Sequence, residues 1–217
     1  MDKINASFLG LLCVSGTDAK KLLQGQLTCD VNEITETHSS LAALCNPQGR
    51  VISLFQLFLF QENYYLQMPR EMVAITSNIL KKYAVFYKVK LHDASDEAIP
   101  PFNTEKNLSE WKRKNIEAGI PAIYPDTSEK FLPHEINLHL LNAISFNKGC
   151  YTGQEIIARM QHRGRLKKEM KLMIVQLDYA PRPGEDFYSE GKIQGIIVDS
   201  VEFEKGKYQI LVILDIK

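Results

Sequence analysis

The chain has 217 residues, of which 45% are hydrophobic and 24% charged, and its 26 basic and 26 acidic residues give a formal net charge of zero. This composition is that of a soluble globular protein with a sizeable core, arranged as one large domain or as one domain with a small addition. Zero net charge excludes a molecule that attracts nucleic acid or an anionic membrane over its whole surface, so any charged partner must meet a local patch.

Alternating apolar residues and turn signals predict a strand-rich first half that is interrupted by helices. Strands are expected at 7–14, 40–44, 51–60, 64–68 and 85–92, with a short further element at 27–31. One helix should begin after Thr17 or Asp18, either of which can cap it, and end at Gln24-Gly25-Gln26. A second helix is expected over 70–83, so the pattern predicts an α+β domain.

The second half begins with a polar, proline-containing stretch over 92–109 that predicts a linker or surface loop. A helix over 110–118 should end at Gly119-Ile120-Pro121, and another should reach about Gln161 after a mixed segment over 132–145. Short strands are expected at 173–177, 194–198 and 208–214, which predicts a small C-terminal β-barrel or sandwich. The expected domains are therefore residues 1–168 and 169–217.

The cysteines are Cys13, Cys29, Cys45 and Cys150, and they form no Cys-x-x-Cys pair and no metal-finger spacing with histidine. Reduced thiols and no metal site are therefore expected, with Cys150 set apart by its neighbours and the other three in packing roles. The start Met1–Asn5 lacks the features of a signal peptide, and the apolar run Val51–Phe60 is too short to span a bilayer. We expect a cytoplasmic protein with no membrane contact; in a eukaryote an organelle matrix also fits.

A helix start is predicted within the stretch Lys148–Glu155. Thr152 and Glu155 have the spacing of a capping box, in which Thr152 caps the helix and Glu155 reaches back to the cap amide. Glu155 and Arg159 are four residues apart, in the favourable orientation for an ion pair on the helix surface.

Cys150 is the candidate nucleophile of this stretch. It would precede the helix N-terminus, where the helix dipole and Lys148 both favour a thiolate over a thiol. Gly149 leaves the backbone free to turn and lets a ligand approach closely. The stretch therefore predicts a nucleophile or an anion-binding site, and the alternative is that Cys150 is an inert buried side chain.

The eight residues from Lys148 to Glu155, with the sequence KGCYTGQE, resemble the signature of the YgfZ proteins, which are folate-dependent iron–sulfur cluster maintenance factors of the YgfZ/GcvT family. Three other blocks resemble the same family in the expected order. They are Val14–Ala19 with Leu23–Thr28, then Ala43–Arg50, then Glu117–Pro121.

The resemblance implies a GcvT-like folate-binding α+β body followed by a C-terminal barrel. It implies tetrahydrofolate or a folate derivative as cofactor, and a role with iron–sulfur enzymes or cluster assembly proteins, including enzymes of tRNA modification. Cys150 is implied as the functional thiol with Lys148 beside it, and Glu117 as an acidic residue that holds the pterin, because a carboxylate can accept two N–H bonds. The implied ligand-contacting residues are Glu117, Gly149, Tyr151, Gly153, Gln154, Glu155 and Arg159.

The sequence departs from the family pattern in three places. The stretch Arg50–Leu54 has no carboxylate where the glycine-cleavage protein carries a catalytic one, so aminomethyl transfer in glycine cleavage is not expected. The segment near 92–110 is shorter than in many relatives, which predicts a reduced subdomain and a changed wall of the ligand cavity. Asn115 stands where an arginine is expected, which removes one candidate contact to the folate carboxylates.

A basic run beside the site helix comprises Arg163, Arg165, Lys167, Lys168 and Lys171. It is either a solvated connector or a patch that attracts the acidic tail of a polyglutamylated folate. No aromatic residues are interleaved with these charges, so nucleic-acid binding is not expected. The histidines His134, His139 and His162 have no metal-ligand spacing.

Three functions remain open from the sequence. The first is a folate-binding factor in iron–sulfur cluster maintenance, the second a folate-dependent aminomethyl or other one-carbon transferase, and the third a non-catalytic folate-binding scaffold. A monomer is expected, and a lone thiol at Cys150 can supply at most one cluster ligand.

Overall fold

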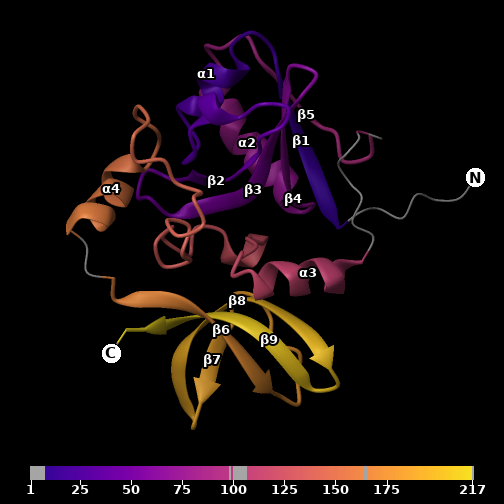
Figure 1. Cartoon of the computed structure of the whole chain (residues 1–217), viewed down its shortest axis with the longest axis vertical. Helices are drawn as coiled ribbons and strands as arrows, with labels where there is room; N and C mark the ends of the chain where they lie inside the picture. The colour runs from indigo at the N-terminus through magenta and orange to yellow at the C-terminus, as the bar shows by residue number, and fades with distance from the viewer. Residues whose placement is uncertain (1–7, 98, 100–106, 164–165, 217) are drawn as a thin grey trace, which may run out of the picture.

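The computed structural model describes residues 8–97, 99, 107–163 and 166–216. Figure 1 shows two sheet units stacked along the long axis of the molecule, with the helix α3 lying between them. Several sequence predictions fall outside the described residues: the N-terminal stretch Met1–Asn5, the first residue of the first strand, positions 98 and 100–106 of the linker, and Arg165.

The first unit is a five-stranded antiparallel sheet in the order β2–β3–β4–β1–β5. Its strands are β1 (Leu9–Ser15), β2 (Ser40–Cys45), β3 (Val51–Phe60), β4 (Asn63–Pro69) and β5 (Lys90–Asp93). The predictions for the first four strands are confirmed to within one or two residues. β5 is shorter than predicted because Val85–Val89 form a turn between the preceding helix and the strand. In this turn Tyr87 N donates to Ala84 O.

Two helices pack with this sheet, α1 (Ala19–Gln24) and α2 (Met72–Ala84). Met72, Val73 and Leu80 of α2 are buried in the main core together with Leu12 of β1. The predicted side-chain cap of α1 is wrong, because the Asp18 carboxylate instead accepts a hydrogen bond of 2.7 Å from Lys88 N. In the part of the chain that the structure describes, no helix is long and apolar enough to cross a membrane.

The chain between the units contains the helices α3 (Leu108–Glu117) and α4 (Gln154–Arg163), joined by a long segment of turns. Among the described residues, two short 3-10 turns, η1 (Val31–Glu33) and η2 (Pro125–Thr127), complete the helical elements. Asn107 caps α3 by accepting from Glu110 N, and Gly119 ends it at a φ of +69°. The turn segment is anchored by apolar side chains that are almost fully buried in the main core: Phe131, Ile136, Leu138 and Ala143.

The second unit is a four-stranded antiparallel sheet in the order β6–β9–β8–β7. Its strands are β6 (Lys168–Gln176), β7 (Asp186–Ser189), β8 (Lys192–Glu204) and β9 (Lys207–Asp215), around a core that includes Phe187, Ile197 and Ile210. The three predicted strands are confirmed, and the predicted α+β class is confirmed. The predicted barrel is not: among the described strands, β6 and β7 are edges and do not pair, so the sheet stays open.

A buried polar cluster joins the two units. Asp199 of β8 is fully buried, and its carboxylate accepts from Lys112 Nζ of α3 at 2.8 Å and from the Tyr124 hydroxyl at 3.1 Å. The β8–β9 register shifts between Ile197 and Asp199, a bulge of the kind that re-aims a side chain. Burial raises the pKa of Asp199, and the Lys112 ammonium opposes that shift. We call Lys112, Tyr124 and Asp199 the junction cluster.

Asp199→Ala should destabilise the protein strongly, because it leaves the Lys112 ammonium and the Tyr124 hydroxyl without their acceptor. Removing one partner of a buried ion pair typically costs about 3 to 5 kcal/mol, and we expect a loss of about 3 kcal/mol in the free energy of unfolding, measured by urea denaturation. Asp186→Ala, at an exposed position of β7, is the control and should change that free energy by less than about 0.5 kcal/mol. Equal losses in both variants would contradict a structural role for the junction cluster.

Candidate functional site

The loop from Lys148 to Gly153 is held against the turn that connects β2 and β3. Gly153 has a φ of +84°, and a Cβ atom there would lie 2.6 Å from the backbone oxygen of Asn46. Since no side chain tolerates that approach, only glycine fits this position. Thr152 adds a second attachment: its backbone N donates to Gly25 O, and its hydroxyl donates to Gln26 Oε1 at 3.0 Å.

The predicted capping box at this helix start is wrong. α4 begins at Gln154, and Gly153 O accepts from Ile157 N, so the cap lies one residue after Thr152. The Thr152 hydroxyl instead donates to Gln26, just after α1, because the loop packs against that end of the helix. The ion pair predicted on the helix surface is confirmed, with 2.9 Å between Arg159 Nη2 and Glu155 Oε1.

The buried side chain of Lys148 holds the loop in place. The residue is 8% exposed, and its Nζ donates to Leu27 O at 2.8 Å and to Cys29 O at 2.7 Å. The ammonium also lies 5.1 Å from the centroid of the Tyr151 ring. Burial lowers the pKa of Lys148 to about 8, against the opposing influence of Cys29 and Asp30. These contacts commit the Lys148 side chain to positioning the loop.

Cys150 is exposed, whereas Cys13, Cys29 and Cys45 are buried as predicted. Burial raises the pKa of Cys29 to about 11 and that of Cys45 to about 12. Cys150 and Gly149 border a cavity of 440 Å³ that is lined mostly by polar residues, here called the Cys150 cavity. Its other walls come from α1 and its surroundings: Thr17, Asp18, Lys20, Lys21, Gln24, Gly25 and Asn32. The loop thus presents one thiol beside two lysines.

The other predicted ligand residues do not gather at Cys150. Tyr151 is buried in the main core, and Glu155 pairs with Arg159 on the exposed face of α4. Glu117 is exposed on α3, where its carboxylate accepts from Gln209 Nε2 of β9 at 3.2 Å. The structure therefore brings Gly149 and Cys150 together and places Glu117 in a different region, against the second unit.

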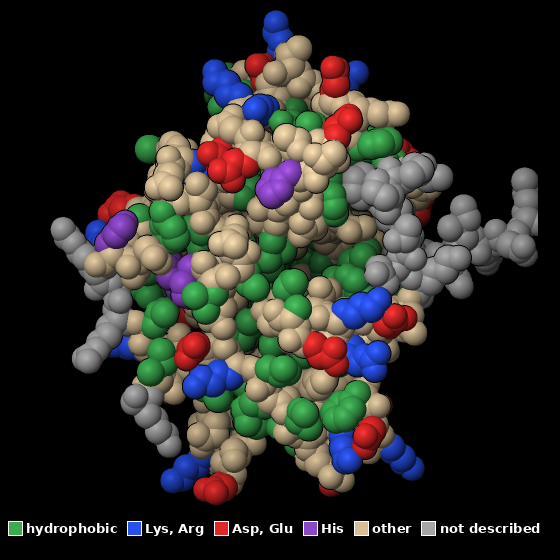
Figure 2. Space-filling model, in the orientation of Figure 1, with side chains coloured by type: hydrophobic (Ala, Val, Ile, Leu, Met, Phe, Trp, Pro, Cys, Tyr) green, Lys and Arg blue, Asp and Glu red, His purple; other side chains and the backbone are tan. Residues whose placement is uncertain are grey.

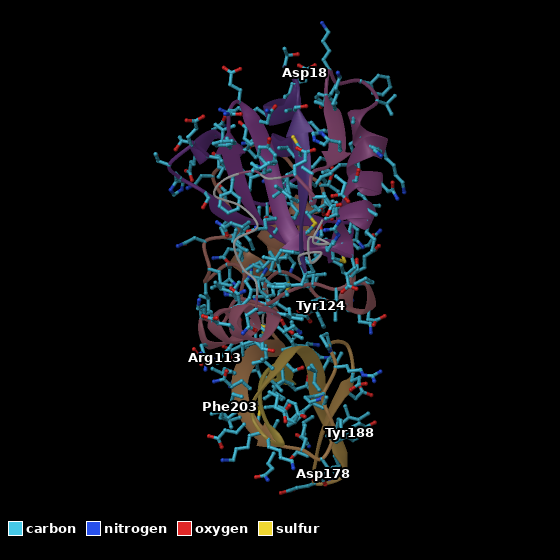
Figure 3. All side chains as sticks on the ribbon, turned by 90° about the vertical axis from the view of Figure 1, so that its right-hand side faces the viewer. Asp18, Arg113, Tyr124, Asp178, Tyr188 and Phe203 are labelled. Carbon is cyan, nitrogen blue, oxygen red and sulfur yellow. The ribbon has the colours of Figure 1, made fainter. Side chains whose placement is uncertain are left out.

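A second and larger cavity, of 570 Å³, lies between the first sheet and α3. It is lined by Phe8, Pro69, Arg70, Glu71, Leu108, Trp111, Lys112 and Tyr124, and we call it the Trp111 cavity. Figure 2 shows apolar side chains gathered around a hollow at mid-height, and Figure 3 labels Tyr124 at the level where the two units meet. Sequence reasoning did not find this site, although the single tryptophan of the chain on an otherwise polar helix was an available signal.

Aromatic rings form the walls of the Trp111 cavity. The Phe8 and Trp111 ring centroids are 5.5 Å apart and tilted by 55°, and Lys112 Nζ lies 4.8 Å from the centroid of the Tyr124 ring. A smaller recess of 110 Å³ shares Pro69 and Trp111 with this cavity. The recess adds three amide side chains, Gln56, Gln67 and Asn115. Flat apolar faces with a few polar groups are typical of small-molecule sites.

The cations at the Trp111 cavity are mostly neutralised. Arg70 Nη2 pairs with Asp96 at 2.7 Å, and Lys112 pairs with Asp199 in the junction cluster. One guanidinium nitrogen, Arg70 Nη1, is buried without a hydrogen-bond partner among the described residues. A buried donor without an acceptor is costly, so this atom is suited to a polar ligand group.

The described residues show no group of three or more His, Cys, Asp or Glu side chains that could hold a metal ion. His134 and His139 stack on each other at 4.8 Å between ring centroids, and His134 Nε2 lies 3.1 Å from Gln161 Oε1 of α4. Burial lowers the pKa of both imidazoles. This pair packs α4 against the turn segment.

Comparison with known proteins identifies the family. No family model matches the chain. It is 33% identical over 208 residues to an uncharacterized protein of Haemophilus influenzae, covering 81% of this chain and 74% of the relative. It is 29% identical to the tRNA-modifying protein YgfZ of Escherichia fergusonii and to that of Escherichia coli, covering 94% of this chain and 82% of each relative. The chain belongs to the YgfZ family. The resemblance found in the sequence is thereby confirmed.

The fold of this YgfZ-family chain is similar to that of the glycine cleavage system aminomethyltransferase T from Bartonella henselae. The TM-score is 0.68 at 13% identity, over 96% of this chain and 77% of the other. The predicted GcvT-like fold is therefore confirmed.

This YgfZ-family chain lacks segments that its relatives carry. Its alignments with the YgfZ relatives extend over 269 positions, whereas the chain has 217 residues. The predicted place of the loss, near 92–110, begins in β5 and ends in α3, and it stays a prediction. This range includes Leu108, which lines the Trp111 cavity.

Lys148→Met should destabilise the protein by about 1 to 3 kcal/mol, because two buried carbonyl oxygens lose their donor. The pKa of Lys148 in the folded chain is about 8, below its ordinary value of 10.5, so between these values the unfolded chain binds more protons. The stability of the native protein relative to the variant should therefore rise as pH increases through that window. Urea denaturation of both proteins at both ends of the pH window measures their difference in the free energy of unfolding. A difference that becomes smaller as pH increases would contradict the prediction.

Proposed function

We propose that this YgfZ-family chain binds a reduced folate in the Trp111 cavity and acts in the assembly or repair of iron–sulfur enzymes. The observation that carries the proposal is the aromatic-walled cavity of 570 Å³, in a fold shared with an aminomethyltransferase. We place this function in the cytoplasm and in a monomer.

The lining of the Trp111 cavity suits the parts of a folate. Phe8, Trp111 and Tyr124 offer flat faces to a pteridine or an aminobenzoyl ring. The free Nη1 of Arg70 offers a donor to a carboxylate of the glutamate tail. The volume lies within the range of about 300 to 1,000 Å³ that is usual for ligand pockets.

The partners proposed are iron–sulfur enzymes or the proteins that assemble their clusters. Two relatives are named tRNA-modifying proteins, so enzymes of tRNA modification are proposed among the clients. Cys150 is the proposed functional thiol because it is exposed in a cavity lined mostly by polar residues, between Gly149 and the lysines of α1. Lys148 is proposed to act by holding that loop in place.

Aminomethyl transfer is not proposed. The stretch Arg50–Leu54 carries no carboxylate, and within it Ser53 is fully buried on β3. The competing function is a scaffold that binds folate but does not use the thiol, and it makes a different prediction for Cys150.

Folate binding should quench the tryptophan fluorescence of the protein, because Trp111 is its one tryptophan and lines the proposed site. Titration with 5-formyltetrahydrofolate is expected to give saturable quenching. Calorimetry should show that Trp111→Ala weakens binding by about tenfold or more, which is about 1.4 kcal/mol. The control is Tyr188→Ala, which removes an exposed aromatic side chain outside the cavity. If the wild-type protein shows no detectable binding of 5-formyltetrahydrofolate, the folate proposal is wrong.

Cys150→Ala should abolish rescue of a strain that lacks its own YgfZ protein, while folate binding and thermal stability stay unchanged. Cys150 lines the Cys150 cavity and does not line the Trp111 cavity. Losing the thiol should therefore leave folate binding unchanged. Cys13→Ala, at a buried cysteine, controls for general effects of losing a thiol. Full rescue by Cys150→Ala would favour the scaffold instead.

A further inference from the structure

The turn between α2 and β5 presents the most exposed large hydrophobic side chain of the described residues. Phe86 is 94% exposed, and its neighbour Val85 is 73% exposed. A single exposed apolar residue is ordinary on a protein surface, so the surroundings of this pair decide whether it has a role.

The charges around this turn are almost all positive. The segment 79–91, which runs from the end of α2 into β5, contains four lysines and no acidic residue. Helix α1 adds two more lysines. In the part of the chain that the structure describes, none of the six takes part in an ion pair. The Phe86 surface is the name used here for Val85 and Phe86 together with these lysines: Lys20, Lys21, Lys81, Lys82, Lys88 and Lys90.

Backbone contacts hold this turn against the loop that precedes α1. Lys88 N donates to the Asp18 carboxylate at 2.7 Å, and Asp18 N donates back to Lys88 O at 3.4 Å. Gly16 allows the close approach, since a Cβ atom there would collide with Lys88 O. A fixed turn loses little conformational entropy on binding, so the exposed ring of Phe86 is preorganised as an anchor.

The Phe86 surface is continuous with the Cys150 cavity. Three residues at the start of α1 line that cavity together with the thiol, namely Asp18, Lys20 and Lys21. Figure 3 labels Asp18 at the end of the molecule that is farthest from the second sheet. A partner that covers Phe86 therefore lies beside the exposed thiol of Cys150.

We propose that the Phe86 surface docks an acidic protein that carries or assembles an iron–sulfur cluster, with Phe86 in an apolar recess of that partner and its carboxylates facing the six lysines. The proposal rests on the iron–sulfur function proposed above. Opposite charges on the two surfaces speed their encounter and fix their orientation. An aromatic anchor inside a polar rim is the usual composition of a protein interface.

This arrangement suits a protein better than a nucleic acid or a lipid surface. Single-stranded nucleic acid is bound on several aromatic faces, where successive bases stack. Here Lys21 Nζ lies 5.9 Å from the centroid of the Tyr87 ring, which leaves Phe86 as the exposed ring of the turn. The neighbouring thiol has a reaction partner only where the docked molecule brings a sulfur or a metal, which a protein can supply.

The test places the photoreactive amino acid p-benzoylphenylalanine in place of Phe86, in the full chain and in a strain that lacks its own YgfZ protein. Irradiation of growing cells should cross-link the chain to an acidic protein that carries or assembles iron–sulfur clusters, identified by mass spectrometry. The same amino acid in place of Tyr188, an exposed residue of the second sheet, is the control and should not give this product.

A charge reversal tests the lysines. Lys81→Glu combined with Lys82→Glu should lower the yield of the cross-linked product by about fivefold or more, because like charges then face each other. The matched control is Lys192→Glu combined with Lys205→Glu, an equal change of charge at exposed positions of the second unit. It should leave the yield within about twofold, because distant charges are screened by salt. Equal losses in both double variants would contradict docking at the lysines.

Phe86→Asp tests the anchor without a photoreactive group. It should abolish rescue of the strain, because a carboxylate replaces the apolar ring and faces an acidic partner. Binding of 5-formyltetrahydrofolate and thermal stability should stay unchanged, because Phe86 is exposed and does not line the Trp111 cavity.

The remaining outcomes each decide against the docking surface. The absence of a cross-linked protein would overturn it, as would a product with a basic protein, with a protein unconnected to iron–sulfur clusters or with a second copy of this chain. Binding of transfer RNA or of phosphatidylglycerol vesicles by the purified protein, lost in Phe86→Asp, would also overturn it. Full rescue by Phe86→Asp, with rescue lost in Cys150→Ala, would overturn the docking surface and leave the proposed function standing. A native chain that does not rescue the strain would overturn both.

Discussion

A buried carboxylate lies where the two units of this protein meet. Asp199 comes from the second sheet, and the two groups that donate to it, the Lys112 ammonium and the Tyr124 hydroxyl, belong to the segment between the two sheets. A fully buried charge is tolerated only when its partners hold it in good geometry, so the units must dock closely for this cluster to form. Because Lys112 and Tyr124 also line the Trp111 cavity, the docking of the second sheet and the shape of that cavity depend on each other.

The structure separates the Cys150 thiol from the Trp111 cavity. The signature loop is fastened by buried Lys148, by the contact of Gly153 with the β2–β3 turn and by Thr152 at the end of α1. These attachments leave Cys150 exposed in its own cavity. The aromatic-walled site lies elsewhere, between the first sheet and α3. The Cys150 cavity and the Trp111 cavity share no lining residue, so substitutions can alter them independently.

Helices and strands were largely predictable because their signals are local. The run Val51–Phe60 and the turns on either side of it predicted β3 residue for residue. Errors occurred where tertiary contacts decide local geometry. Asp18 accepts from Lys88 instead of capping α1, and Thr152 donates to Gln26 instead of capping α4. The four-residue strand β7 was missed because it exists only through its pairing with β8.

The amino-acid sequence by itself determined the family, the α+β class, the buried state of three cysteines and the identity of the signature loop. Those features depend on residue types and spacings along a continuous stretch of chain. Only the tertiary structure decided that Glu117 lies outside the aromatic cavity, that Lys148 is bound to backbone carbonyls, and that the second sheet stays open. The reason is physical: which side chains share a cavity is set by the packing of segments distant in sequence, such as Pro69–Glu71 against Trp111 and Tyr124.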